Sequence, residues 1–453
     1  MSGTTLVQKH PQDFVKYLKD EGIHRFYFVP RPKENRMVSS HPQLQPIAEF
    51  IQNDKRDFAD HEGLFFQVCP EYDVLQGAFV HRTRRGQAAG GVRYWNYDTV
   101  ETYLRDGLRL GKGMTRKNAL AGLWWGGGKG VMARNPDLNP GNEEARASIY
   151  SAYGAFISSL RGCYVTAEDV GTCVADMAHI FSRTRFTTCI PEEWGGSGNP
   201  SVPTARGVIC GMEAALEFLN LGELEGKTIA VQGMGNVGRP LIQFLFEKKV
   251  KKIYAADIDP VLVDKVRADF TGMNLDAKRL SPDDVSLFEA EVDIFSPNAT
   301  GAVLNPVTIP LLRSKIVCGA ANNQLEDAAR DDGLLFGRAI VYVPDFLTNR
   351  MGIVNAANEQ YGYVNNDPLF ERHLERDWVH SIRRTTLNML KESREKGEPT
   401  ARITMAMADK LSMEEHPIFG HRGRLIIDSL VEDEWHHRSG LDRESAFAAG
   451  HRK

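Results

Sequence analysis

The stretch that decides the fold reads Thr228-Ile229-Ala230-Val231-Gln232-Gly233-Met234-Gly235-Asn236-Val237-Gly238. Its first residues predict a buried strand, and three glycines in the spacing G-x-G-x-x-G follow at once. A helical pattern then runs to about Lys248, and a second strand pattern ends at Asp257, 19 residues beyond Gly238. Strand, glycine turn, helix, strand and terminal acid are the full context of a dinucleotide-binding fingerprint. The stretch therefore predicts the first βαβ unit of a doubly wound α/β domain.

Each glycine of the fingerprint has its own physical task. Gly233 permits the tight turn after the strand, Gly235 lets the backbone approach a pyrophosphate, and Gly238 lets the helix pack closely. We expect the pyrophosphate at the N-terminus of the helix, where N–H groups and the helix dipole favour an anion. Asp257 would accept a hydrogen bond from the ribose 2′-hydroxyl and repel a 2′-phosphate, so NAD is favoured over NADP.

Further strand patterns extend this sheet toward the C-terminus. They cover Asp293 to Pro297, Lys315 to Gly319 and Ile340 to Val343. The loops after the first two are polar, and we expect Asn298 to Gly301 and Ala321 to Gln324 to face the nicotinamide side of the crevice.

The segment before the fingerprint belongs to another domain. Residues 194–203, Trp-Gly-Gly-Ser-Gly-Asn-Pro-Ser-Val-Pro, have the composition of a linker and mark the boundary. Upstream, residues 64–81 have the pattern of a β-hairpin, and residues 99–119 have the apolar spacing of a helix.

Two acids follow a short strand pattern at Cys163-Tyr164-Val165. Glu168 and Asp169 would stand at the carboxyl end of that strand, where open α/β sheets bind their ligands. Alternatively, they cap the next helix, which we expect from Thr172 to Phe181. The sequence leaves both interpretations open.

Two lysines twelve residues apart are candidates for chemistry. Lys129 stands among four glycines in residues 126–130, Gly-Gly-Gly-Lys-Gly, which we expect to form a loop with positive φ angles or a close backbone contact. Lys117 lies at the end of the predicted helix. If both face one pocket, each lowers the pKa of the other, so one could hold an anionic substrate while the other acts as a base. The alternative is a glycine turn with a solvated lysine.

The composition is that of an ordinary globular protein. Its 453 residues allow two or three domains, and 55 Lys and Arg against 59 Asp and Glu give a net charge of −4, which favours neither nucleic acid nor an anionic membrane. The cysteines lack metal-ligand spacing, and we expect His436 and His437 to be a solvated pair, so no metal site is predicted. With no evident targeting segment or membrane-length apolar run, we expect a cytoplasmic protein.

Seven motifs occur in one order along the chain. They are Gly-Gly-Val-Arg (90–93), Met-Thr-Arg-Lys-Asn-Ala (114–119), Gly-Gly-Gly-Lys (126–129), Thr-Ala-Glu-Asp-Val-Gly-Thr (166–172), Gly-Ser-Gly-Asn-Pro (196–200), Gly-Met-Gly-Asn-Val-Gly (233–238) and Gly-Ala-Ala-Asn-Asn-Gln (319–324). This ordered set resembles the glutamate/leucine/phenylalanine/valine dehydrogenase superfamily, most closely its leucine and phenylalanine branch, over roughly residues 60–415.

The resemblance implies an architecture and a reaction. The implied α/β chain comprises an N-terminal extension (1–60), an α/β substrate domain (61–200), a Rossmann doubly wound NAD-binding domain (201–360), C-terminal helices that return to the substrate domain (361–415) and a C-terminal tail (416–453). The implied reaction is reversible, NAD-dependent oxidative deamination of an L-amino acid to its 2-oxo acid and ammonia, carried out by a homo-oligomer.

The resemblance also implies roles for individual residues. Lys129 resembles the catalytic lysine that activates water, Asp169 the acid that exchanges protons with the substrate amino group, and Lys117 the lysine that binds the substrate carboxylate. The implied substrate pocket comprises Ala89, Gly90, Gly91, Met114, Ile353 and Ala356. The implied cofactor site comprises Thr204, Gly233, Gly235, Asn236, Val237, Gly238, Asp257 and Asn322.

Three departures from the family pattern bear on the substrate. In the glutamate branch a lysine precedes the double glycine, but Ala89 stands there, which disfavours glutamate. Ala356 stands where a larger residue or a serine is expected, so together with Ala89 it would make room for an aromatic side chain. The pattern Asn-Ala-Gly-Gly-Val is Asn-Arg-Met-Gly-Ile at 349–353, which introduces the bulky Arg350 and Met351.

Two alternatives to an apolar or aromatic amino acid dehydrogenase remain open. Arg350 could bind the distal carboxylate of glutamate, which would make the protein a glutamate dehydrogenase. Arg350 and Met351 could instead close the substrate cleft and leave a catalytically silent NAD-binding regulatory protein.

We predict that the purified protein reduces NAD, and not NADP, with a subset of L-amino acids, because Asp257 would repel the 2′-phosphate of NADP. The measurement is formation of the reduced nicotinamide at alkaline pH across all twenty L-amino acids, with both cofactors in parallel. A signal confined to phenylalanine, tryptophan, leucine or valine supports the prediction. If no amino acid leads to reduction of either cofactor although NAD still binds, the regulatory alternative is favoured.

Overall fold

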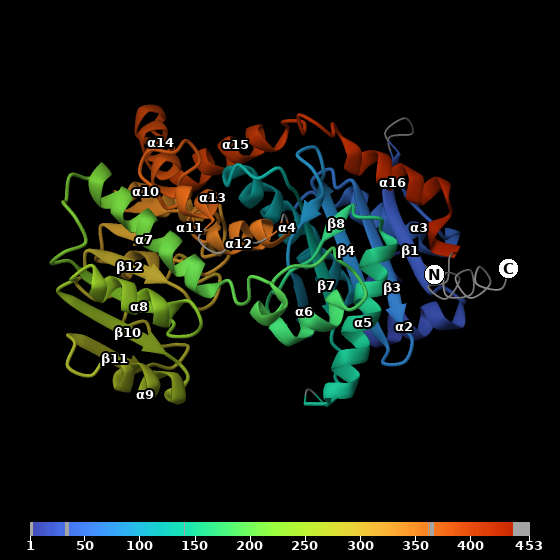
Figure 1. Ribbon diagram of the computed structural model, residues 1–453, viewed down its shortest axis with the longest axis horizontal. Helices are drawn as coiled ribbons and strands as arrows, with labels where there is room; N and C mark the ends of the chain where they lie inside the picture. The colour runs from blue at the N-terminus through green and yellow to red at the C-terminus, as the bar shows by residue number, and fades with distance from the viewer. Residues whose placement is uncertain (1–2, 32–35, 140, 361, 363–366, 438–453) are drawn as a thin grey trace.

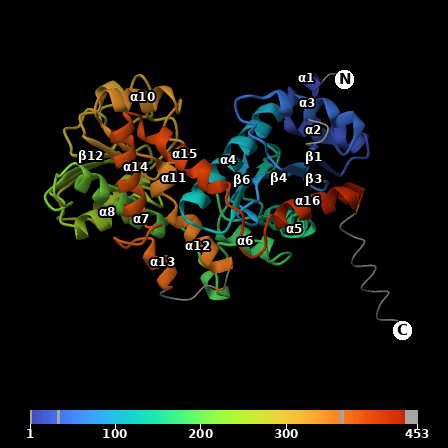
Figure 2. The ribbon, with the colours of Figure 1, turned by 90° about the horizontal axis from the view of Figure 1, so that it is seen from above.

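The computed structural model describes residues 3–31, 36–139, 141–360, 362 and 367–437, which form two α/β lobes (Figure 1). One sheet comes from strands between residues 25 and 165, and the other from strands between residues 228 and 343. Helices α4, α12 and α15 lie between the lobes when the molecule is seen from above (Figure 2). Two separate sheets confirm the predicted mixed α/β architecture with a doubly wound domain.

The first sheet is mixed and has the strand order β2-β1-β3-β4-β7-β5-β8, with β6 also paired to β7. Its strands are β1 (Arg25–Arg31), β2 (Arg36–Ser39), β3 (Gly63–Cys69), β4 (Val74–Arg82), β5 (Ala88–Ala89), β6 (Val92–Trp95), β7 (Gly126–Ala133) and β8 (Tyr164–Val165). Strands β3 and β4 pair antiparallel, which confirms the predicted hairpin.

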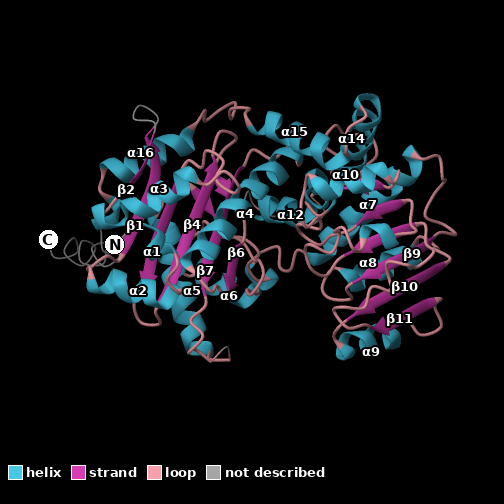
Figure 3. Ribbon diagram, turned by 180° about the vertical axis from the view of Figure 1, so that it is seen from behind, coloured by secondary structure: helices cyan, strands magenta, loops and turns pink. Residues whose placement is uncertain are grey.

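Helices cover both faces of the first sheet because its strands are apolar on both sides (Figure 3). Successive residues of a strand point to opposite faces, so Phe26 joins one buried cluster and Tyr27 the other. The first face carries α1 (Gly3–Val7), α2 (Pro11–Asp20), α3 (Gln45–Asn53), which follows the 3₁₀ turn η2 (Pro42–Leu44), and α4 (Val100–Leu120). The second face carries α5 (Glu143–Ser159), α6 (Val174–Phe181), α16 (Arg422–Glu432) and the 3₁₀ turn η5 (Trp435–His437).

The second sheet is fully parallel, with the order β11-β10-β9-β12-β13-β14. This is the 3-2-1-4-5-6 order of a dinucleotide-binding domain, with the topological switch between β9 and β12. Its strands are β9 (Thr228–Gln232), β10 (Lys252–Asp257), β11 (Leu275–Arg279), β12 (Ile294–Pro297), β13 (Ile316–Cys318) and β14 (Val341–Val343). The βαβ unit predicted from the fingerprint is thus present at the centre of the sheet.

The remaining helices surround this second sheet or join the lobes. They are α7 (Ser201–Phe218), α8 (Gly238–Glu247), α9 (Pro260–Asp269), α10 (Arg330–Gly337), α11 (Asp345–Thr348), α12 (Met351–Gln360), α13 (Pro368–Arg372), α14 (Ile382–Lys396) and α15 (Thr400–Ser412), with 3₁₀ turns η3 (Glu192–Trp194) and η4 (Ile309–Leu311). None of the described helices combines the length and the apolar character needed to cross a membrane.

Three parts of the expected domain plan differ from the structure. Residues 25–39 are not a separate extension, because β1 pairs with β3 and β2 with β1. Helix α14 packs on the second lobe rather than returning to the first, since Ile382 and Met389 belong to that lobe's core. In the expected tail, α16 packs on the first sheet, while residues 438–453 lie outside the described residues. The apolar pattern of these elements shows that one side of each is buried, but not which lobe buries it.

Two buried histidines hold helix α4 against the first sheet. The Nε2–H of His61 donates to the carbonyl oxygen of Leu108 (2.9 Å), and its Nδ1 accepts the N–H of Ala59 (3.3 Å). His81 accepts the hydroxyl of Thr115 at Nδ1 (2.7 Å) and donates from Nε2 to the carbonyl of Ala59 (2.9 Å). Burial lowers the pKa of His61 to about 3 and the pKa of His81 well below its usual range. Both rings are therefore neutral in the folded protein at neutral pH.

We predict that the first lobe loses stability between pH 7 and pH 5. The unfolded chain binds protons at its histidines near pH 6.5 and the folded chain does not, so the free energy of unfolding falls as the pH drops, by about 2 kcal/mol for His61 at pH 5. Urea unfolding at the two pH values measures this difference. His61→Gln keeps an N–H donor toward Leu108 but cannot titrate, so its pH dependence should be shallower; an unchanged dependence would contradict the assignment.

Candidate functional site

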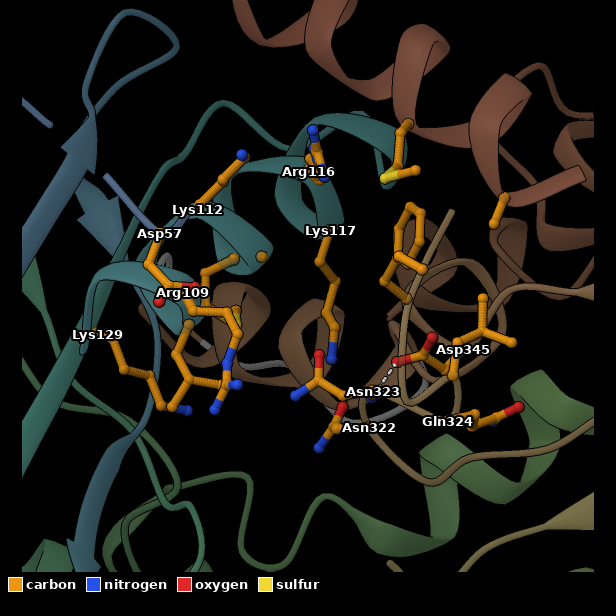
Figure 4. Close-up of a pocket in the computed structure, with 18 of the residues that line it drawn as sticks. Asp57, Arg109, Lys112, Arg116, Lys117, Lys129, Asn322, Asn323, Gln324 and Asp345 are labelled. Carbon is orange, nitrogen blue, oxygen red and sulfur yellow. Dashed lines mark hydrogen bonds between the residues drawn. The ribbon is translucent and has the colours of Figure 1, made fainter. Parts of the chain in front are cut away.

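A cavity of about 610 Å³ lies between the two lobes (Figure 4). Helix α4, the strands β6 and β7 and the loop after β8 line it from the first lobe. The loops after β13 and β14 and helix α15 line it from the second. Lys117, Lys129, Asp169 and Asn322 all reach this cavity, so the fold brings together four residues that are far apart in the sequence.

Lys129 lies in a buried strand and not in a loop. Residues 126–130 belong to β7, and none of the four glycines has a positive φ, so the expected loop with positive φ angles is wrong. The glycines instead permit close contacts: a Cβ on Gly127 would lie 2.0 Å from the backbone nitrogen of Thr115 on α4, and one on Gly130 would lie 2.2 Å from the Tyr153 hydroxyl. The missing side chains let α4 and α5 pack directly on the strand that carries Lys129.

The Lys129 ammonium forms an ion pair with Asp169 (Nζ to Oδ2, 3.0 Å). Asp169 also receives the Nε–H of Arg93 (3.3 Å), and Arg93 forms a second ion pair with Asp106 on α4 (3.0 Å). Tyr97 donates its hydroxyl to Asp106 (2.7 Å). The chain of contacts fixes the Asp169 carboxylate between two cations.

This network sets the charges of Lys129 and Asp169. Burial lowers the pKa of Lys129, while the nearby Asp169 charge acts in the opposite direction. Burial alone would raise the pKa of Asp169, but Lys129 and Arg93 outweigh it and hold the pKa at about 2. Lys129 and Asp169 therefore form an ionised pair, and the charge of Lys129 depends on the Asp169 carboxylate beside it.

The other acid of the motif, Glu168, does not line the cavity. Its carboxylate lies near Asn199 (3.5 Å), and burial raises its pKa to about 7. The interpretation that the two acids cap the next helix is wrong, because the N–H of Cys173 at the start of α6 is bound by Asp176 (2.8 Å).

Lys117 projects from the last turn of α4 into the cavity, toward Asn323 and Asp345 (Figure 4). The helix end is held in place by Asn118, which donates to the carbonyl of Gly126 on β7 (2.5 Å). Burial lowers the pKa of Lys117 to about 8, with Asp345 opposing and Lys129 reinforcing the shift. Within the described residues Lys117 has no ion-pair partner, so its ammonium is available to an anion.

The opposite wall is a loop held by two side chains that the sequence did not single out. The Asn349 amide donates to Oδ1 of Asn322 (2.8 Å), which orients the Asn322 amide at the cavity. The Asp345 carboxylate accepts the N–H of Asn323 (2.9 Å), whose φ of 53° is in the left-handed region. Burial raises the pKa of Asp345.

The fingerprint has the geometry of an anion-binding turn. Gly233 has a φ of 92°, a Cβ on Gly238 would lie 1.9 Å from the carbonyl oxygen of Gly233, and a Cβ on Gly235 would meet no atom within 4 Å. In the described part of the chain, the N–H groups of Gly235, Asn236 and Val237 donate to no acceptor. Open space beside free N–H groups at a helix start fits a pyrophosphate.

Asp257 at the end of β10 stabilises this turn from within. Its carboxylate accepts the N–H of Met234 (2.7 Å) and the N–H of Asp259 (3.0 Å). A carboxylate has about four acceptor positions, so capacity remains for a ribose hydroxyl.

The expected substrate-pocket residues lie beside the cavity but mostly beneath its surface. Met114 lines the cavity, while Ala89, Ile353 and Ala356 belong to one buried apolar cluster. Gly90 and Gly91 are also buried: a Cβ on Gly90 would lie 2.8 Å from Met114, and one on Gly91 would lie 2.8 Å from the Asp169 Cβ. The small residues thus border both Met114 and the ionised Asp169.

Arg350 does not reach the cavity. It is fully buried and donates to the carbonyl oxygens of Leu120 (2.6 Å) and His380. Met351 is in the core of the second lobe. Both alternatives built on Arg350 are therefore wrong in their geometry, because its guanidinium neither faces a substrate carboxylate nor closes the cleft.

Three further expectations concern Thr204, a metal site and the histidine pair near the C-terminus. Thr204 donates to the carbonyl of Pro200 within α7 (2.9 Å). Among the described residues, no group of three or more His, Cys, Asp or Glu is arranged to hold a metal ion. The prediction that His436 and His437 are both solvated is only half correct. His437 is exposed, but His436 packs against Tyr27 and His41.

Arg93, Asp106, Asp345 and Asn349 are site residues that the sequence analysis did not name as candidates. A signal existed for Arg93, which ends the Gly-Gly-Val-Arg motif, and for Asn349, which begins Asn-Arg-Met-Gly-Ile. No local pattern marked Asp106, because it lies within the predicted helix like any solvated acid.

Residues 69–186 match the family model described as "Glu/Leu/Phe/Val dehydrogenase, dimerisation domain", and residues 195–414 match "Glutamate/Leucine/Phenylalanine/Valine dehydrogenase". The chain is 42% identical to leucine dehydrogenase of Geobacillus stearothermophilus over 305 residues, which is 67% of this chain and 79% of the relative. It is 36% identical to phenylalanine dehydrogenase of Lysinibacillus sphaericus, over 67% and 78% of the two chains.

The fold is also similar to that of a solved amino acid dehydrogenase. The crystal structure of L-tryptophan dehydrogenase from Nostoc punctiforme superposes with a TM-score of 0.63 at 32% identity. The match covers 78% of this chain and 96% of that chain.

We predict that Lys117 titrates near pH 8, more than two units below an exposed lysine, because burial disfavours its charged form. Competitive acetylation followed by mass spectrometry measures the pKa of individual lysines, with the exposed Lys16 on α2 as the reference. Asp345→Asn should lower the pKa further, since it removes the opposing carboxylate. Titration of Lys117 together with Lys16 would contradict the burial of its ammonium.

Proposed function

The chain belongs to the glutamate/leucine/phenylalanine/valine dehydrogenase family, and from this premise we propose that it uses NAD to deaminate an apolar or aromatic L-amino acid oxidatively to its 2-oxo acid and ammonia. The observation that carries the proposal is the convergence of Lys117, Lys129 and Asp169 in one cavity between the lobes. Nucleotide binding alone needs none of these three residues.

Two charged groups in the cavity complement the two backbone charges of an amino acid. The unpaired Lys117 ammonium would bind the α-carboxylate, and Asp169 would accept a hydrogen bond from the α-ammonium. Met114 and the small residues at 89–91 border the same space, which leaves an apolar region for the side chain. No cation occupies positions 89–91 or 114, so a second substrate carboxylate would have no ion-pair partner on this side of the cavity.

The fingerprint turn is the proposed site of the dinucleotide. Its free N–H groups would bind the pyrophosphate, and Asp257 would accept the ribose 2′-hydroxyl. Loops after β12 and β13 would contact the nicotinamide, with Asn322 at its edge. Bound there, the nicotinamide ring would supply the hydride acceptor for the substrate α-carbon.

Substrate binding would change the state of Lys129. In the structure, the carboxylate of Asp169 raises the pKa of Lys129 against the effect of burial. An incoming α-ammonium would take over this carboxylate and add a positive charge nearby, and both effects favour the neutral lysine. Lys129 would thus become a base when the substrate is in place.

The chemical steps then follow from the two residues. Asp169 takes a proton from the α-ammonium, and loss of hydride from the α-carbon gives an iminium. Neutral Lys129 removes a proton from water as it adds to the iminium carbon. Asp169 returns its proton to the nitrogen and then accepts the hydroxyl proton as ammonia leaves, while the positive Lys129 stabilises the oxygen that becomes the oxo group.

We also propose that the active form is a homo-oligomer. The support is the description of the model matched by residues 69–186 as a dimerisation domain.

We predict that Lys129→Ala and Asp169→Asn each lower kcat by about 10²- to 10⁴-fold, because each removes a proton-transfer group. Lys117→Ala should instead raise the KM of the amino acid by about 10- to 100-fold, since it removes one charged contact. Steady-state kinetics with NAD and the best amino acid measures both. Lys16→Ala, at an exposed position on α2 that does not line the cavity, is the control; equal activity of wild type and Lys129→Ala would rule out the mechanism.

A further inference from the structure

Glu359 lies near the C-terminal end of α12 and binds a segment of the first lobe. Its Oε2 accepts the N–H of Cys189 (2.8 Å), the N–H of Ser197 (2.8 Å) and the Ser197 hydroxyl (2.5 Å). Its Oε1 faces the N–H of Ile190 (3.4 Å). One carboxylate thus satisfies four donors from residues 189–197, which run into the linker at 194–203.

The segment is shaped to receive an anion. Cys189 has a φ of 60°, a left-handed conformation that side chains other than glycine rarely adopt. This conformation turns the consecutive N–H groups of Cys189 and Ile190 toward the same carboxylate, as in an anion-binding nest. Hydrogen bonds to a charged group are about twice as strong as neutral ones, so Glu359 stabilises a conformation that would otherwise be strained.

A second residue of α12 reinforces the contact. Asn355, one helical turn before Glu359, donates its amide to the carbonyl oxygen of Ser197 (3.2 Å). In the part of the chain that the structure describes, all side-chain hydrogen bonds of α12 go to this segment. Among the described residues, the side chains of α12 therefore form hydrogen bonds with the first lobe alone.

The apolar side chains of α12 join both lobes. Met351 and Val354 belong to the core of the second lobe, whereas Ile353, Ala356 and Ala357 belong to the cluster of the first lobe that contains Ala89. Apolar packing is not directional, so it does not by itself fix the helix in one position between two cores. The hydrogen bonds of Glu359 and Asn355 supply that restriction.

We propose that Glu359 is a positioning residue that holds Ile353 and Ala356 in the apolar cluster on which Met114 of the cavity packs, and thereby sets the selectivity for the substrate side chain. The proposal rests on the proposed function. An added methylene changes discrimination between substrates by about 10- to 200-fold. Such discrimination needs a pocket that does not yield, so loss of the Glu359 contacts should weaken discrimination by size.

The test compares Glu359→Ala, Glu359→Gln and a matched control, Glu371→Ala. Glu371 forms an exposed bidentate ion pair with Arg206 (2.9 and 2.8 Å) and does not contact residues 189–197. Steady-state kinetics are measured with valine, leucine, phenylalanine and tryptophan. In Glu359→Ala we expect KM for the best amino acid to rise about tenfold, kcat to change less than about threefold, and the ratio of kcat/KM between best and worst accepted substrates to fall about tenfold.

Glu359→Gln keeps one acceptor oxygen for Cys189 and Ser197, so it should restore the ratio to within about threefold of wild type. If Glu359→Ala does not fold, Ser197→Ala replaces it, with a smaller shift in the same direction. A uniform loss of kcat on all substrates with an unchanged KM and ratio would show a merely structural role and overturn the proposal. Unchanged kinetics would overturn it as well.

Hydrogen exchange separates this proposal from the proposed function, because it needs no turnover. In Glu359→Ala, the amides of residues 189–197 and 353–357 should exchange faster than in wild type, and in Glu371→Ala they should not. If the wild type oxidises no amino acid, the proposed function fails while exchange still reports whether Glu359 holds α12. Unchanged exchange in α12 would overturn the positioning role.

Discussion

The structure depends on one buried ion pair, Lys129 with Asp169, at the junction of the lobes. A charged lysine in a central strand is costly to desolvate, and the network through Arg93 and Asp106 offsets this cost by keeping the neighbouring carboxylate ionised. The same arrangement leaves the lysine charge dependent on a single partner. A ligand that competes for this partner would therefore change the chemistry of Lys129 without any movement of the backbone.

Close packing around β7 keeps this pair in register with Lys117. Gly127 allows the backbone of α4 to touch the strand, and Asn118 ties the helix end to the strand's first carbonyl. The neutral His81 holds Thr115 on the same helix. Lys117 and Lys129 thus come from two elements that cannot shift independently, which keeps both ammonium groups at one cavity.

The second lobe contributes to the site through loops, and α12 packs on the first lobe behind the cavity lining. Parallel strands place the loops after β13 and β14 at one edge of the sheet, where Asn322 and Asp345 meet the cavity. Helix α12 follows these strands in sequence but contacts the first lobe through Glu359 and Asn355. A helix encoded by the second half of the chain is therefore tied to the first lobe by hydrogen bonds.

The sequence by itself determined the dinucleotide-binding unit, because strand, glycine turn, helix and terminal acid are local patterns. It also indicated Lys117, Lys129 and Asp169 as site residues, through motifs that occur in a family-like order. Only the tertiary structure decided that the glycines around Lys129 form a strand, since their purpose is contact with Thr115 and Tyr153. It also decided the direction of Arg350, whose partners Leu120 and His380 are remote in sequence. Local patterns specify backbone shape, whereas the partner of a buried charge depends on which distant segments the fold brings beside it.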